Sequence, residues 1–207
     1  MPRFLLCLLS LLLPLAAQAA DDNKMLFVEY RLVSKQIAAD SFDAQSKRVW
    51  RIGRDFLRFE DAPNPQTKIH GLIVVAEPDI WIADLNTNQA QHTVDPGPIY
   101  KIHFPLFASE ASEKLRQLEF GYELEFFHDN NARELAPQDL DGYKCRVYRF
   151  ETDDREVLLF VKTDDTPVQV VVKSPEYEYA MRFLRYDANR KPDKSLFQLP
   201  PGVQLKN

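Results

Sequence analysis

The chain has 207 residues, with 31 acidic side chains against 26 Lys and Arg, a formal net charge of −5 and 45% hydrophobic residues. This length suffices for one domain with its own core, and 14 Phe, 8 Tyr and 2 Trp against only 6 Gly argue against a disordered or low-complexity chain. Because basic residues do not cluster in the sequence, the composition also argues against a nucleic-acid partner.

The first 19 residues have the parts of a secretory signal peptide. Arg3 supplies a positive charge, residues 4–17 are apolar, and small residues flank Gln18. The alternative is a membrane anchor, but the apolar run is shorter than the roughly 20 residues that a bilayer requires, and Pro14 interrupts it. We therefore predict cleavage after Ala19 and an exported, periplasmic protein, residues 20–207, without a transmembrane span.

Cleavage there makes Cys145 the single cysteine of the mature chain. One thiol cannot form an internal disulfide, so the fold must depend on its hydrophobic core. In a strand, Cys145 shares one face with Tyr143 and Val147, which predicts a buried and unreactive thiol. A redox site or an intermolecular bridge is the alternative.

From residue 25 onward, β-branched and aromatic residues alternate with polar ones, and turn-forming residues separate the runs. Residues 119–127 are the clearest example, because every second side chain from Phe120 to Phe126 is apolar and glutamates occupy positions between them. The strands expected from this pattern cover residues 25–35, 43–52, 56–60, 68–76, 79–85, 89–94, 99–106, 119–127, 142–151, 155–163, 168–173 and 177–183. Short connections between them favour antiparallel neighbours.

One segment has a helical pattern. Residues 109–118 begin with a Ser that can cap a helix, carry acids early and have Lys114 and Arg116 late, as the helix dipole favours. A second short turn is expected near residues 136–140. The sequence thus predicts a mainly β fold: a curved antiparallel sheet that forms an unclosed (half) barrel, with one or two short helices against its concave face.

No catalytic, metal or cofactor motif is present in the sequence. His70, His92, His103 and His128 are far apart and form no metal-ligand pair, and the paired aspartates at 139/141, 153/154 and 164/165 fall at predicted turns. Neither a nucleophile elbow nor a phosphate-binding loop occurs. The residues therefore predict a protein that is not an enzyme and that has no cofactor, although a site assembled from distant residues stays open.

The apolar faces are the stronger signal. A helix of ten residues is about 15 Å long and cannot cover the apolar face of so many strands. Either the barrel closes and fills its interior, or a cavity remains for an apolar ligand. The candidate ligand-binding residues are Trp50, Trp81, Phe120, Tyr122, Leu124, Phe126, Tyr177, Tyr179, Met181 and Phe183.

Three passages occur in a recognisable order. Residues 47–60 read KRVWRIGRDFLRFE, residues 73–84 end in IWIAD, and residues 193–203 read DKSLFQLPPGV. In this order they resemble the periplasmic lipoprotein-carrier superfamily (LolA/LolB-like), which includes related exported proteins of unassigned function. The resemblance covers about residues 25–205.

The resemblance implies an unclosed β-barrel lined with apolar side chains, with helices as a lid, that carries acyl chains of lipoproteins or other lipids. The chain departs from the family in having no amphipathic helix before its first strand. The lid-locking arginine of the family matches Arg48, Arg51, Arg54 and Arg58 equally well, so no role is transferred to any of them.

Two functions are therefore expected. The first is a periplasmic binding or carrier protein whose partner is a lipid or a lipidated protein. The second is an interaction module with a filled barrel that docks on an envelope protein, with the proline-framed loops 61–66 and 95–98 as contact points.

Overall fold

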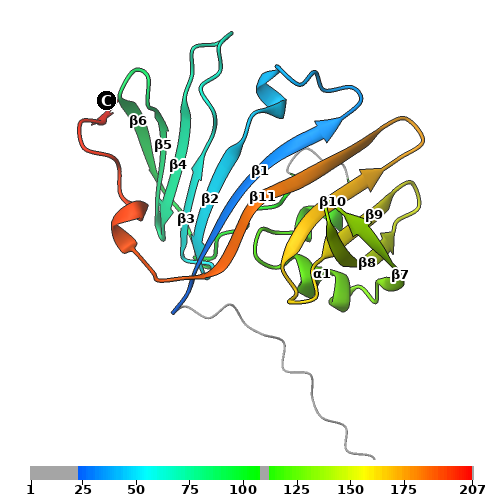
Figure 1. Ribbon diagram of the computed structural model, residues 1–207. Helices are drawn as coiled ribbons and strands as arrows, with labels where there is room; N and C mark the ends of the chain where they lie inside the picture. The colour runs from blue at the N-terminus through cyan, green and yellow to red at the C-terminus, as the bar shows by residue number, and fades with distance from the viewer. Residues whose placement is uncertain (1–22, 108–111, 207) are drawn as a thin grey trace, which may run out of the picture.

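The computed structural model describes residues 23–107 and 112–206 (Figure 1). The predicted signal peptide lies outside the described residues. The described chain forms a 12-stranded sheet whose two outermost strands, β12 and β7, do not pair with each other, so the sheet is unclosed. The predicted fold class is thereby confirmed.

The elements fall into two groups along the chain. The first group contains β1 (Met25–Ser34), β2 (Lys47–Ile52), β3 (Phe56–Glu60), β4 (Gly71–Ala76), β5 (Asp79–Asp84) and β6 (Gln89–Val94). The second contains α1 (Glu123–Asp129), β7 (Arg133–Leu140), β8 (Tyr143–Glu151), β9 (Glu156–Val161), β10 (Pro167–Lys173), β11 (Glu178–Arg190) and β12 (Gln204–Leu205). Single 3-10 turns lie at Phe42–Ala44, Leu115–Gln117 and Lys194–Phe197.

The strand order is β12-β6-β5-β4-β3-β2-β1-β11-β10-β9-β8-β7. Each group is a meander of antiparallel neighbours, and the antiparallel pair β1 and β11 joins the two groups in the middle of the sheet. β12 is the exception, because it pairs with β6 in parallel. Strands β6 and β7, which follow one another among the strands of the chain, therefore lie far apart in the sheet.

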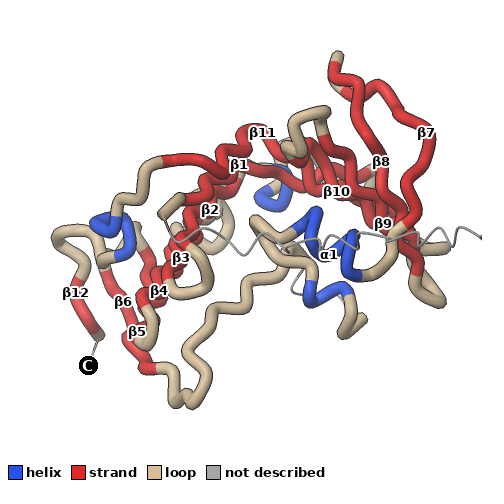
Figure 2. The backbone as a smooth tube through the Cα atoms, turned by 90° about the horizontal axis from the view of Figure 1, so that it is seen from below, coloured by secondary structure: helices blue, strands red, loops and turns tan. Residues whose placement is uncertain are grey.

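The chain between β6 and α1 crosses the concave face of the sheet. We call residues 95–107 and 112–122 the crossing segment. Figure 2 shows the sheet arching over the crossing segment and α1. One backbone hydrogen bond attaches the crossing segment to the turn after β2, because the Ile102 amide donates to the Arg54 carbonyl (2.8 Å). Another joins the two parts of the segment, because the Leu106 amide donates to the Leu118 carbonyl (2.8 Å).

The crossing segment and α1 together form what we call the cover. The hydrophobic core lies between the concave face of the sheet and this cover. Side chains from β1, β2, β3, β4, β8, β9, β10 and β11 pack against the crossing segment and α1 in one cluster, which we call the concave core. Phe120, Leu115, Leu118 and Phe127 of the cover are fully buried there. The centre of the concave side is therefore filled by protein side chains.

A second cluster covers the opposite, convex face of β2 to β6. Phe197 follows β11 and is only 2% exposed because it packs against Phe56, with 5.5 Å between ring centroids. The chain then continues to β12 at the edge of the sheet. Both faces of this part of the sheet are thus apolar. Strands in which apolar and polar residues alternate predict only one apolar face.

The predicted strand at residues 119–127 is wrong. The strand pairing of Glu119 is limited to an isolated β-bridge with Pro105. Gly121 has a φ of +87°, and α1 begins at Glu123. In α1 the buried residues are Glu123, Phe126 and Phe127, which are spaced as on one face of a helix. The helical spacing of the buried side chains therefore describes this region, and the alternation of apolar and polar residues expected of a strand does not. Glycine is favoured here because L side chains rarely adopt a φ of +87°, and a Cβ would in addition lie 2.9 Å from a Leu26 methyl carbon.

The predicted strand at residues 99–106 is also wrong, because this part of the chain belongs to the crossing segment. Pro105 removes one backbone donor that a central strand would need, and Pro98 directly precedes the predicted strand. The predicted helix at 109–118 lies partly outside the described residues, and its described part contains only the 3-10 turn Leu115–Gln117. Residues 136–140 are not a helical turn but part of the edge strand β7, where a bulge accommodates Pro137.

Cys145 lies on β8 with 0% of its surface exposed, and burial raises the pKa of its thiol. We expect a maleimide dye to leave the native protein unlabelled and to react fully after denaturation. Labelling of the native protein at a rate comparable to that of the denatured chain would contradict the buried position.

Candidate functional site

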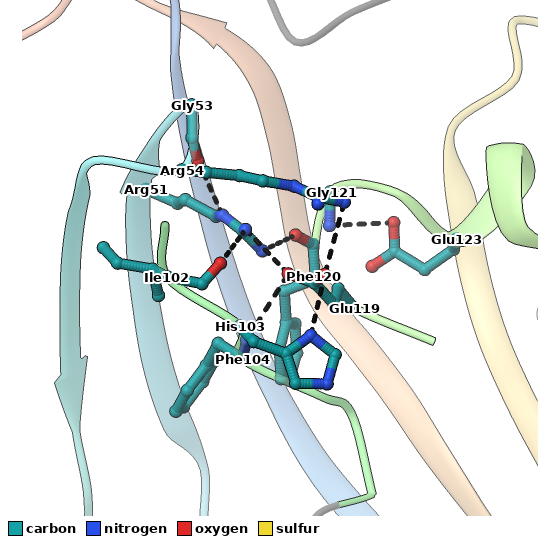
Figure 3. Close-up of polar contacts among 10 residues, drawn as sticks. All are labelled: Arg51, Gly53, Arg54, Ile102, His103, Phe104, Glu119, Phe120, Gly121 and Glu123. Atoms are coloured by element: carbon teal, nitrogen blue, oxygen red, sulfur yellow. Dashed lines mark hydrogen bonds and ion pairs between the residues drawn. The ribbon is translucent and has the colours of Figure 1, made fainter. Parts of the chain in front are cut away.

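A buried arginine connects the sheet to the crossing segment. Arg51 on β2 is 2% exposed. Its Nε donates to the Gly53 carbonyl (2.7 Å), and its two terminal nitrogens donate to the Phe120 carbonyl (2.9 Å), the Ile102 carbonyl (3.2 Å) and Glu119 Oε2 (2.7 Å). Figure 3 shows the guanidinium group directed at the crossing segment. Three of its four acceptors belong to that segment, so Arg51 fastens the cover to the concave face.

Glu119 is the acidic partner in this arrangement and is itself 2% exposed. Its carboxylate is also paired with Arg54 (3.3 Å) and His103 Nδ1 (3.0 Å). Burial by itself raises the pKa of Glu119, but the charge and hydrogen bond of Arg51 outweigh it and hold the pKa below its ordinary value. Glu119 is therefore ionised and keeps Arg51 compensated inside the protein.

Tyr122 lies beside the same two arginines. The guanidinium carbons of Arg51 and Arg54 are each 4.6 Å from the centre of its ring. Such cation–π contacts are favourable when the cation is partly desolvated. Tyr122 thus adds to the attachment of the crossing segment where it enters α1.

A second buried carboxyl group lies one residue further on. Glu123 is 1% exposed, and its Oε2 accepts hydrogen bonds from the Tyr186 hydroxyl (2.7 Å) and the Gly121 amide (3.0 Å). Its Oε1 has no hydrogen-bond partner among the described residues. Burial raises the pKa of Glu123 to about 7, and burial together with the neighbouring Glu123 raises that of Tyr186 well above its ordinary value.

A cleft of about 540 Å³ opens beside these groups. Leu26, Arg51, Gly121, Tyr122 and Tyr186 contribute to its wall, as does Asp165 of the turn between β9 and β10. This volume lies within the range of small-molecule sites. Its lining is polar and charged, however, which does not suit an apolar ligand.

The concave face also has an apolar part that the cover leaves open. Val49, Phe59, Ile73 and Ile82 are cross-strand neighbours on β2, β3, β4 and β5, so they share one face of the sheet. Val49 is fully buried in the concave core, Phe59 and Ile73 are half-buried, and Ile82 is 55% exposed. Exposure of apolar side chains thus increases along the row from the core toward β5.

Other half-buried apolar side chains extend this row. Ile80 of β5 lies on the same face, because it pairs with the concave Val75, and Phe104 of the crossing segment packs against Phe59 with 5.6 Å between ring centroids. We call Phe59, Ile73, Ile80, Ile82 and Phe104 the open apolar surface. It is continuous with the core and partly accessible to solvent.

The structure separates the ten predicted ligand-binding residues into three groups. Four are buried in the concave core, namely Phe120, Phe126, Met181 and Phe183. Four are half-buried on the concave side, namely Tyr122, Leu124, Tyr177 and Tyr179. The remaining two, Trp50 and Trp81, pack on the convex face with the cluster around Phe197.

Sequence reasoning missed the residues with the most distinctive chemistry. In the sequence, Arg51 is one of four equivalent arginines, and the alternation places Glu119 and Glu123 on the polar face of a strand. The alternation in residues 47–52 does place Arg51 on the same side as Val49, which is a sign of burial. Its partner is 68 residues away, so the sequence alone does not indicate the pair.

Two kinds of feature are absent from residues 23–107 and 112–206, which the structure describes. No group of three or more His, Cys, Asp or Glu residues there is placed to hold a metal ion. Within the same residues, no helix has the length and apolar character needed to cross a membrane.

Comparison with known proteins shows the fold. No protein-family model matches the chain, and its sequence matches no curated protein. An uncharacterized conserved protein from Thermus thermophilus is similar in structure, with a TM-score of 0.52 and 10% identity over 89% of this chain and 90% of that protein. This likeness extends over nearly the whole of both chains and concerns the fold alone.

Two weaker matches have lower scores. An outer membrane lipoprotein-sorting protein domain from Vibrio parahaemolyticus matches with a TM-score of 0.29 and 9% identity, over 79% of this chain and 85% of that domain. PNGF-II matches with a TM-score of 0.37 and 9% identity, over 88% of this chain but only 30% of its own length. The chain therefore has a distant structural match to a lipoprotein-sorting domain, at low identity.

Proposed function

We propose that this protein is a periplasmic binding or carrier protein for lipid or lipoprotein acyl chains, and that it acts without catalysing a reaction. The observation that carries the proposal is the open apolar surface, in which Ile82 is 55% exposed and is followed toward the core by half-buried Ile73 and Phe59. A concave face that continues outward from a core is suited to shield an alkyl chain from water.

The affinity of such a surface comes from the hydrophobic effect. Each methylene group removed from water contributes about 0.8 kcal/mol, so a chain of several methylenes binds without any charged or metal contact. No cofactor is needed for this function. The flexible, unbranched shape of an acyl chain also fits a surface formed by side chains from three adjacent strands and the crossing segment.

The crossing segment provides a means to change the size of the site. It is fastened to the sheet by the hydrogen bonds of Arg51 and by the pairing of Lys101 with Asp55 (2.8 Å). Beneath it lies the apolar concave core. Displacement of the crossing segment would join the open apolar surface to that core, which provides room for a longer chain.

A pair of matched variants tests the location of the site. Ile82 and Val94 are 55% and 53% exposed, but Val94 pairs with Asp79 and so lies on the convex side, whereas Ile82 lies on the concave side. We expect Ile82→Gln to weaken binding of a fluorescent fatty acid by about tenfold, the effect of losing one or two buried methylenes. Val94→Gln serves as the control and should bind like the unmodified protein.

The measurement is a fluorescence titration at equal protein stability, checked by thermal unfolding. Equal affinities of the two variants would place the ligand elsewhere. No binding by the unmodified protein, together with native mass spectrometry that finds no lipid in protein purified from the periplasm, would contradict the proposed function itself.

The filled centre of the concave side favours a second candidate, an interaction module that docks on an envelope protein. Phe120, Phe127, Leu115 and Leu118 occupy the space under the cover that a large ligand would need. Cross-linking in the periplasm that yields one stoichiometric partner and no bound lipid would support this function. Lipid found in native mass spectra would exclude a purely structural core.

A further inference from the structure

Glu123 joins the helix α1 to the central strand pair. Glu123 is the first residue of α1, and its Oε2 accepts hydrogen bonds from the Tyr186 hydroxyl of β11 (2.7 Å) and the Gly121 amide (3.0 Å). Its Oε1 is buried and has no partner among the described residues. Only one of the two carboxylate oxygens is therefore hydrogen-bonded, so the ionised form is incompletely satisfied in this buried position.

The charged groups around Glu123 do not compensate a negative charge. Arg51 of β2 is the cation whose charge favours the carboxylate, but its nitrogens are already bonded to Glu119 and to three carbonyls. β11 contributes the neutral Tyr186, and β1 contributes Leu26 next to Gly121.

The two strands that pack against α1 are β8 and β9, and β9 contributes the apolar side chains Val157, Leu159 and Val161 to the concave core. β8 meets the helix through aromatic contacts, Phe126 with Phe150 (5.4 Å) and His128 with Tyr148 (5.4 Å between ring centroids). On α1 itself, Glu125 is half-buried, and burial and then Asp129 raise its pKa. Glu125 is therefore the group from which the effect of Glu123 must be separated by experiment.

We propose that ionisation of Glu123 releases α1 and the crossing segment from the concave face, so that protonation closes this cover and loss of the proton opens it. The cleft lined by Tyr186, Gly121 and Tyr122 gives protons access to this region. If the proposed function holds, the opening exposes the apolar concave core to an acyl chain. The opening itself does not depend on a ligand.

The direction of the effect follows from proton linkage. The pKa of Glu123 is about 7 in the closed form, because of burial, and 4.5 for an exposed glutamate, so the closed form holds the proton more tightly. The contribution of protonated Glu123 to the stability of the closed form is therefore complete below pH 4.5 and is lost as the pH rises to about 7. Between these values, one proton changes the opening equilibrium by up to about tenfold per pH unit.

Hydrogen–deuterium exchange on the ligand-free full chain measures this opening. After correction for the intrinsic exchange rate, protection of α1 and the crossing segment should fall by nearly tenfold per pH unit between about pH 5 and 7 and level off above it. Glu123→Gln should remove this dependence and keep the segment protected at about pH 8. Glu125→Gln is the matched control on the same helix and should behave like the unmodified protein.

A second measurement does not need a variant. The carbon-13 shift of the Glu123 carboxyl group, followed by NMR during a pH titration, should change with a midpoint near 7. A midpoint at the ordinary value of 4.5, or a pH dependence that Glu125→Gln removes and Glu123→Gln retains, would overturn the proposal. Both experiments are done without ligand, so they test the proton-linked opening independently of the proposed function. Absence of fatty-acid binding would contradict the proposed function alone.

Discussion

Replacement of Arg51 by methionine is expected to lower the free energy of unfolding by about 3–5 kcal/mol, the usual cost of removing one member of a buried ion pair. The side chains of Arg51 and Glu119 are 2% and 3% exposed, so the variant leaves the Glu119 carboxylate buried beside a methionine. It also leaves the carbonyls of Ile102 and Phe120 without this donor. Urea denaturation followed by circular dichroism measures the loss.

Arg48→Met is the matched control on the same strand. The Arg48 side chain is 45% exposed and pairs with Glu60 on the convex face, so we expect a loss of less than about 1 kcal/mol. In the double variant Arg51→Met, Glu119→Gln, part of the lost stability should return, because no buried charge is left uncompensated. If Arg51→Met costs no more than Arg48→Met, the crossing segment is not held by the buried pair.

Phe127→Ala is expected to destabilise the protein by about 3–5 kcal/mol, because it removes a large side chain from a filled core. Phe127 is 0% exposed on α1 and belongs to the concave core. Leu124→Ala on the same helix is the control, since Leu124 is only half-buried and should cost clearly less. Thermal unfolding of both variants provides the comparison.

This prediction also bears on the ligand site. If Phe127→Ala stays as stable as the unmodified protein but loses fatty-acid binding, the space under α1 accommodates ligand and the side chain is not part of a permanent core. A large loss of stability instead means that the filled centre supports the fold and that the open apolar surface is the part available to a ligand.

The strands that the sequence predicted well are those with local turns and one clear period. Residues 56–60 and 89–94 are strands with the expected bounds, because each is delimited by turn-forming residues. The region 119–127 failed because its apolar residues fit two periods. Every second side chain from Phe120 to Phe126 is apolar, but Gly121 at φ +87° ends the extended chain and the helix face of Phe126 and Phe127 is then buried.

The convex position of Trp50 and Trp81 has a different cause. Local alternation places Trp50 opposite to Val49, but it does not say which face is inside. In this protein both faces are covered, because the chain after β11 returns to pack Phe197 against the convex side. Only tertiary structure reveals that return, and the same holds for the pairing of Arg51 with Glu119.

The pairing of β1 with β11 has a consequence for how the protein folds. All other antiparallel neighbours are close in sequence, so the meanders β1–β6 and β7–β11 can each form from local hairpins, whereas Met25 meets Arg190 only after nearly the whole chain is available. Such distant contacts are slow to form. Until they do, β1 and β11 each present an unpaired edge, and a chain that ends before β11 would retain open edges prone to aggregation. Folding of this protein is therefore expected to be limited by the joining of two preformed halves.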